Sequence, residues 1–138
     1  VPDAMPPGHG EAARRAVAAM RRHPEMVAGT DRLCTALMRA GSHGLIAKIG
    51  AEGIYGLAFA RHGRGYGVAL KIADGEGVRA RFSAALEALR QLGGLAPEAA
   101  AELRARFVGE MRNHRGLLVG RVETVFDLAG PPVRRPSR

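Results

Sequence analysis

The middle of the chain carries the feature that most restricts its fold, namely three short apolar segments separated only by tight turns. These segments cover residues 45–50, 54–61 and 67–73. Glu52-Gly53 fits the first turn, because glycine readily adopts positive φ, and the GRGYG segment at 63–67 supplies the second. Connections this short cannot hold the crossover helix that parallel strands require. The three segments are therefore predicted to pair as antiparallel strands.

Helical spacing of apolar residues appears on both sides of these strands. Helices are predicted at 11–22, 31–40, 75–92 and 97–107. Pro24 is expected to stop the first helix, Thr30 or Asp31 to cap the second, and Asp74 to cap the third. The β-branched segment 118–126 is predicted to return as a fourth strand of the same sheet.

Together these elements predict an α+β fold in which an antiparallel sheet is flanked by helices. A chain of 138 residues is long enough for one compact domain. We expect this domain over residues 1–130, followed by a basic tail at 131–138. The chain begins with Val1 and a loop-like run of proline and glycine, which is typical of an internal cut in a longer protein.

The charge and cysteine content restrict the partners. The formal net charge is +8, but the arginines are spread along the chain with few aromatic residues to stack bases, so no nucleic-acid partner is predicted. No apolar run approaches the roughly 20 residues that span a membrane, so no membrane partner is predicted. The single cysteine, Cys34, excludes an internal disulfide, is expected to be a buried thiol and fits a cytoplasmic protein.

Lys48 is one of only two lysines in a chain that otherwise uses arginine as its cation. Strand alternation places it with Ile46 and Gly50 on one face. Two interpretations remain open, a strand that lines a hydrolase cleft and a solvated surface charge. Lys71 is expected to be structural. His43 and His62 could face each other at the open end of the hairpin, which leaves a two-histidine metal site as a further alternative.

Several segments occur in the order and spacing of one enzyme family. They are HPEMVAG (23–29), RLCTALMRA (32–40), AKIGAEGIYG (47–56), GVALKIADG (67–75) and NHRGLLVGRV (113–122). Through them, residues from about 11 to 125 resemble the C-terminal half of an asparaginase II-type amidohydrolase. The resemblance implies hydrolysis of L-asparagine to aspartate and ammonia. It also implies a partial version of the fold shared by serine β-lactamases, penicillin-binding proteins and bacterial glutaminases.

The resemblance implies roles for four residues. Lys48 would be the catalytic lysine of a K-x-G strand, although Ile49 replaces the hydroxyl residue found in penicillin-binding proteins. Gly50 and Ala51 would form the oxyanion side, with the Ala51 N–H as donor, and Glu52 would contact the substrate amino group. The S-x-x-K nucleophile is absent. None of Ser42, Ser83 and Ser137 has a lysine three positions later.

An incomplete site implies a partner, either the missing N-terminal half or another chain, with a homodimer as an alternative. Uncovered apolar surface is expected for the same reason. No cofactor is expected within this chain, and zinc would enter the full-length protein through an upstream Asp-Gly-Cys segment. We expect the chain alone to be inactive, and Thr35 is the first suspect should it turn over substrate. The rival hypothesis is a non-enzymatic family remnant or a basic binding module.

Overall fold

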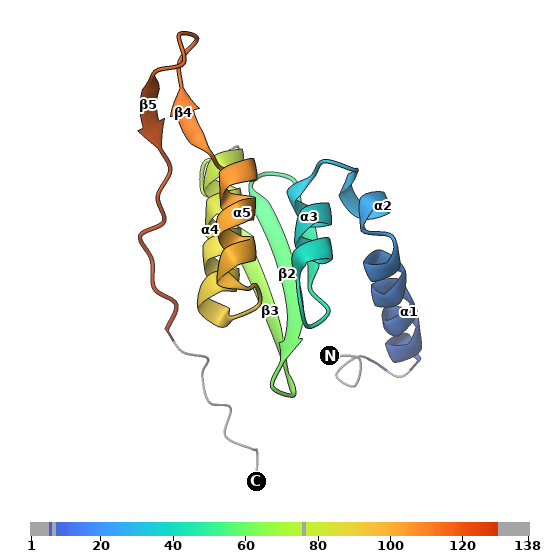
Figure 1. The fold of residues 1–138 in the computed structure, drawn as a ribbon. Coiled ribbons are helices and arrows are strands. Elements are labelled where there is room, and N and C mark those ends of the chain that lie inside the picture. Colours follow the sequence, from blue (N-terminus) through green and yellow to red (C-terminus); the bar gives the residue numbers. More distant parts are fainter. Residues whose placement is uncertain (1–5, 7, 76, 130–138) are drawn as a thin grey trace.

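The computed structural model describes residue 6, residues 8–75 and residues 77–129. Three helices precede a three-stranded sheet along the chain and two follow it, which confirms the α+β class (Figure 1). The helices are α1 (His9–Arg22), α2 (Pro24–Ala28), α3 (Leu33–Ala40), α4 (Val78–Leu92) and α5 (Pro97–Phe107). The strands are β1 (Ile46–Ile49), β2 (Ile54–Arg61), β3 (Arg64–Lys71), β4 (Glu110–Arg112) and β5 (Leu118–Arg121).

The main sheet has the order β1-β2-β3 and is antiparallel throughout, as predicted. Lys48 on β1 lies opposite Gly56 on β2. The turn between β2 and β3 is tighter than expected, because Arg61 pairs directly with Arg64 and leaves only His62 and Gly63 between the strands. Both turn residues have positive φ, 49° and 72°, which is the geometry of a two-residue hairpin that follows the strand twist.

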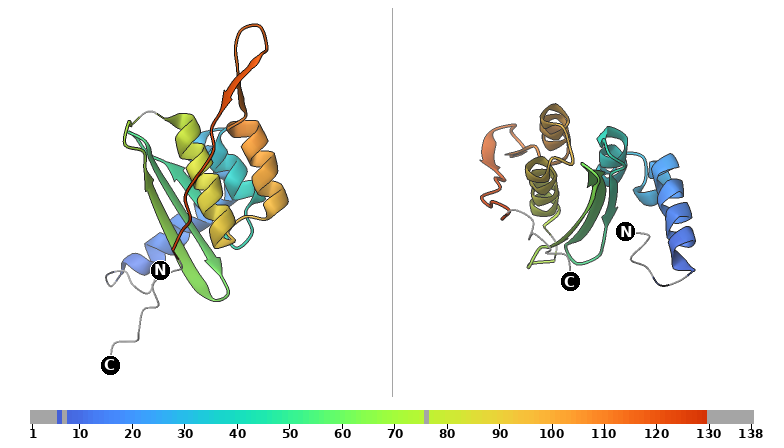
Figure 2. Two further views of the ribbon diagram at one scale, coloured as in Figure 1. Left: turned by 90° about the vertical axis from the view of Figure 1, so that its left-hand side faces the viewer. Right: turned by 90° about the horizontal axis from the view of Figure 1, so that it is seen from below.

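The core lies between the sheet and helices α3, α4 and α5, which all cover one face of the sheet (Figure 2). Alternate residues of β2 point into it, so that Tyr55, Leu57 and Phe59 are buried while their neighbours are more exposed. Burial of each leucine side chain contributes about 1.5–3 kcal/mol. The buried leucines of the helices are Leu33, Leu37, Leu86, Leu89 and Leu103.

Helix boundaries follow the predicted segments, but two predicted caps are wrong. Neither Thr30 nor Asp31 caps α3; its N-cap is Arg32, which makes no side-chain cap hydrogen bond. The N-cap of α4 is Gly77 and not Asp74, although Asp74 Oδ1 accepts the Gly77 N–H at 3.1 Å. The Asp74 carboxylate thus binds the backbone N–H of the N-cap residue and is not itself at the N-cap position.

The prediction of a fourth strand in the main sheet is also wrong. β5 is shorter than the predicted segment and pairs only with β4, in a separate hairpin that projects away from the helices (Figure 1). The chain after β5 runs back beside α4 in an extended conformation (Figure 2). Arg104 Nη2 donates to Val122 O at 2.8 Å, and Gln91 Nε2 donates to Phe126 O at 2.7 Å. Side chains of α4 and α5 therefore hold the segment that the sheet was expected to hold.

Helix α1 has no buried residue and lies across the sheet from α4 and α5, near Ile46, Ala58 and Ala60 (Figure 2). It ends at Arg22, as the position of Pro24 predicts, and Pro24 then begins the short helix α2. Within the described residues, no helix has the length and apolar character needed to cross a membrane. The predicted tail at 131–138 lies outside the described residues.

Candidate active site

The face of the sheet opposite the core, here called the outer face, is built mainly from small residues. Ala58, Ala60 and Ala69 are exposed on it, and so are the glycines of β3. Backbone and small side chains leave an open depression of about 410 Å³ across all three strands. The depression is lined by Ile46, Lys48, Gly56, Leu57, Ala58, Gly67, Val68 and Ala69. A substrate or a second polypeptide could therefore lie close to the strand backbone here.

Lys48 lies on the outer face, as strand alternation predicts, since Ala47 beside it is buried in the core. Its side chain is exposed, and Nζ donates a hydrogen bond to the Ile49 carbonyl oxygen at 2.7 Å. The ammonium thus stays at the edge of the depression next to the K-x-G backbone. Its catalytic role stays a prediction beside the alternative of a surface charge.

The turn after β1 is a tight hairpin turn, as the Glu52-Gly53 pair predicts. Glu52 and Gly53 have φ values of 50° and 75°, and the Ile54 N–H donates to Ala51 O at 3.1 Å. The Gly50 N–H closes the turn by donating to Ile54 O at 2.9 Å. Ala51 is exposed, and its N–H has no hydrogen-bond partner within the part of the chain that the structure describes. That N–H is consequently free to bind a ligand.

Two cations hold this turn from opposite sides. Lys71 Nζ donates to the Glu52 carbonyl oxygen and lies 3.9 Å from Glu52 Oε2, in agreement with a structural role. Arg81, on the first turns of α4, donates from Nη1 to Gly50 O at 3.2 Å. Glu52 itself is 85% exposed in its side chain, so its carboxylate is available to a substrate amino group.

Sequence reasoning missed Arg81. Val78, an apolar residue of the same helix, is 48% exposed, whereas Arg81 is only 7% exposed. A signal was present, because Arg81 precedes Ala85 and Ala88 at helical spacing, which places it on the buried side.

Beneath the turn, Tyr55 and Cys34 form a buried pair, with Cys34 Sγ 3.1 Å from Tyr55 Oη. The prediction of a buried thiol is confirmed, since Cys34 is 2% exposed. Burial raises the pKa of Tyr55 well above its usual range, and the contact with Cys34 acts in the same direction, while the nearby Arg81 charge opposes it. Tyr55 therefore remains a neutral structural group under the candidate site.

Thr35 is the other buried hydroxyl of interest. Its Oγ1 lies 3.1 Å from Pro24 O and 2.5 Å from Gly29 O, so its proton is used to tie α3 to the α2 region. A hydroxyl group whose proton is donated to backbone carbonyl oxygens, with no base beside it, is a poor nucleophile. We therefore assign Thr35 a structural role.

The described residues do not fit a zinc site. They contain no group of three or more His, Cys, Asp or Glu side chains that could hold a metal ion. Cys34 is buried against Tyr55 and cannot serve as an accessible ligand. His43 and His62 both lie in turns with positive φ, at 64° and 49°, and no third ligand joins them within this part of the chain.

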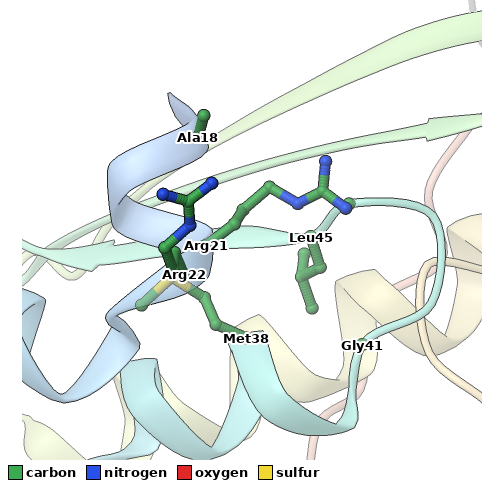
Figure 3. A pocket seen from close by; sticks show the side chains of 7 residues that line it. Ala18, Arg21, Arg22, Met38, Gly41 and Leu45 are labelled. Carbon is green, nitrogen blue, oxygen red and sulfur yellow. The ribbon is translucent and has the colours of Figure 1, made fainter. Parts of the chain in front are cut away.

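A second hollow lies between the end of α1 and α3 (Figure 3). It measures about 410 Å³, and Arg21 and Arg22 extend into it from the last turn of α1, with Met38 and Leu45 below them. Its lining includes neither a carboxylate nor a hydroxyl, thiol or imidazole. This hollow offers charge without a group that could attack or protonate a substrate, so the outer face near Lys48 is the better candidate active site.

Comparison with known proteins agrees with the sequence resemblance. The family model of L-asparaginase II matches residues 2–124, which include all three strands of the main sheet and the turn at 50–53. No curated protein matches the chain.

Proposed function

Because the chain belongs to the L-asparaginase II family, we propose that it is the lysine-bearing part of an asparaginase-type amide hydrolase with a fold like that of the serine β-lactamases. Its substrate is L-asparagine. Hydrolysis breaks the bond between the side-chain carbonyl carbon and nitrogen, consumes one water molecule, and yields aspartate and ammonia. The nucleophile, the serine of an S-x-x-K motif, comes from a polypeptide segment outside the 138 residues.

The observation that carries this proposal is the free Ala51 N–H beside the exposed Lys48. A donor at that place can bind the oxyanion that develops when a nucleophile attacks an amide carbonyl. Lys48 lies on β1, three residues before Ala51, and supplies an amine that can exchange a proton, which a guanidinium cannot do. Glu52, with its side chain 85% exposed, would contact the substrate ammonium group.

The exposed outer face supports the need for a second polypeptide. Its small residues and its shallow depression offer a surface on which an element bearing the nucleophile can lie close to Lys48. The missing N-terminal half is the proposed partner, and a second copy of the chain is the alternative. Any zinc would be held by that partner, since the described residues do not fit a metal.

Ammonia release from L-asparagine tests the proposal. The purified chain should give none above background, because no serine in it is followed by the S-x-x-K lysine. In the longer protein that carries the upstream segment, Lys48→Arg should lower kcat about 10²-fold through loss of proton transfer. Lys71→Arg is the matched control and should have a mild effect.

Equal and mild effects of the two substitutions would show that Lys48 is a surface charge. Turnover by the chain alone would locate a nucleophile within the 138 residues. Absence of ammonia release by the longer protein would favour a non-enzymatic family remnant.

A further inference from the structure

We propose that Arg81 is a positioning residue that fixes and polarises the peptide group between Gly50 and Ala51. The catalytic meaning of this role rests on the proposed function, whereas the role itself can be tested without any activity. Arg81 donates to the Gly50 carbonyl oxygen at 3.2 Å from a position 31 residues away in the sequence. The N–H of that same peptide group is the free donor of Ala51.

The burial of Arg81 is the first reason to assign it a task. The residue is 7% exposed, and its Nε is buried without a hydrogen-bond partner. No carboxylate forms an ion pair with it within the described residues. A buried guanidinium with an unsatisfied N–H destabilises a fold, and an apolar side chain of similar size would avoid that cost.

The second reason is the chemistry of the group that Arg81 contacts. A hydrogen bond from a cation to a carbonyl oxygen is stronger than a neutral one, and in a low-dielectric interior it polarises the acceptor. Withdrawal of electron density toward Gly50 O makes the Ala51 N–H at the other end of the peptide group a better donor. A preorganised N–H of this kind is what an oxyanion site requires.

The third reason is geometric. The turn at 50–53 rests on two short backbone hydrogen bonds, Gly50 to Ile54 at 2.9 Å and Ile54 to Ala51 at 3.1 Å. Arg81 reaches the turn from the core side and Lys71 from the outer side, at Gly50 and Glu52 respectively. The direction of the Ala51 N–H is thus set from both sides before any ligand arrives.

Amide hydrogen exchange and carbonyl chemical shifts of the 138-residue chain, measured by NMR, test the assignment. In Arg81→Met, the amides of Gly50 and Ile54 should exchange about tenfold to 100-fold faster, because a hydrogen bond to a charged group is lost. The Gly50 carbonyl carbon and the Ala51 amide proton should both shift toward values of a less polarised peptide. In Arg81→Lys, which keeps a charged donor, the exchange rates and the chemical shifts should both lie close to those of the parent chain.

The matched control is Arg104→Met. Arg104 also makes contacts with the core side, donating to Ser83 Oγ at 2.9 Å and to Val122 O at 2.8 Å, but it does not contact the turn. The Arg104→Met variant should leave the amide exchange rates of Gly50 and Ile54 unchanged relative to those of Leu57 and Phe59 on β2.

Equal acceleration of all these amides in Arg81→Met would reduce Arg81 to a contributor to global stability and overturn the proposal. Unchanged or slower exchange, the result expected if Arg81 only fills space, would also overturn it. Should Arg81→Met fail to fold, Arg81→Gln takes its place, and a Gly50 carbonyl resonance identical to that of the parent chain then contradicts polarisation. Because these readouts require no turnover, a failure of the asparaginase assignment would appear separately, in the ammonia assay.

Discussion

At the scale of single residues, Glu87 is the clearest case of a charge adjusted by its neighbours. Arg90 donates two hydrogen bonds to its carboxylate, at 2.9 and 2.7 Å, and Gln91 donates a third at 2.8 Å. The hydrogen bonds from Arg90 are the main reason that the pKa of Glu87 falls to about 2, against the opposing effect of burial. The folded protein therefore holds Glu87 ionised far into the acidic range.

This lowered pKa predicts a pH dependence of stability. A carboxylate whose pKa is lower in the folded state stabilises the protein above its unfolded pKa of about 4.5 and loses that contribution as pH falls toward 2. Arg90 is 55% exposed, so solvent screening reduces the effect to the order of 1 kcal/mol. Urea unfolding at neutral and acidic pH should show this loss in the parent chain but not in Glu87→Gln.

Glu98→Gln, a substitution in the exposed first turn of α5, is the control and should keep the parent pH dependence. If Glu87→Gln loses as much unfolding free energy on acidification as the parent chain, the hydrogen bonds of Glu87 with Arg90 and Gln91 do not cause the loss of stability in acid.

Residue positions within strands could be predicted from the sequence because alternation has a period of two. That period placed Lys48 outside and Ala47 inside. The turn at Glu52-Gly53 was also predictable, since its conformation needs a glycine. Helical spacing with Ala85 and Ala88 indicates that Arg81 lies on the buried side of its helix. Its partner could not be predicted, because the hydrogen bond to Gly50 O joins distant segments that no local pattern connects.

At the scale of elements, the chain after β5 shows how side chains replace strand pairing. Gln91 is the anchor, because its Nε2 donates to Phe126 O and its Oε1 accepts the Leu128 N–H, both at 2.7 Å. One glutamine thereby binds two peptide groups of the extended segment. β-propensity correctly indicated an extended chain here, but it could not show whether a sheet or a helix would receive it.

Gln91→Ala should release this segment. Each lost hydrogen bond is worth about 0.5–1.5 kcal/mol, so cleavage after Phe126 by a chymotrypsin-type protease should become roughly tenfold faster under native conditions. Arg115→Ala, in the loop of the β4–β5 hairpin, is the control and should cleave at the parent rate. An unchanged rate in Gln91→Ala would mean that packing, and not Gln91, retains the segment.

At the scale of the whole molecule, helices α3, α4 and α5 lie on one side of the sheet, whereas α1 lies on the other side and leaves much of that face open (Figure 2). The sequence predicted the layers, because helices before and after a meander must cover it. It did not predict which face would remain open, since β2 carries apolar residues on both faces. Ala58 and Ala60 are apolar but small, and it is the large residues Tyr55, Leu57 and Phe59 that turn inward.

The edge of β3 has a physical consequence for the protein in solution. No strand pairs with its second edge within the described residues, and its eight residues lack the proline that would prevent pairing with another molecule. What opposes such stacking is mutual repulsion between molecules of net charge +8, reinforced by Arg64 and Lys71 at the two ends of the strand.

Repulsion of this kind depends on ionic strength, because its range shrinks to about 10 Å at 0.1 M salt and about 3 Å at 1 M. Light scattering should therefore record a monodisperse chain in dilute buffer and growing particles as sodium chloride is added. Ala69→Pro should suppress that growth, because the register of the hairpin turns the Ala69 N–H toward the free edge of β3 and not toward β2. Particle size independent of salt would mean that the strand edge is protected by shape and not by charge. Because the same cations keep the molecules apart, the salt concentration of the buffer decides how long the protein stays unassociated in storage.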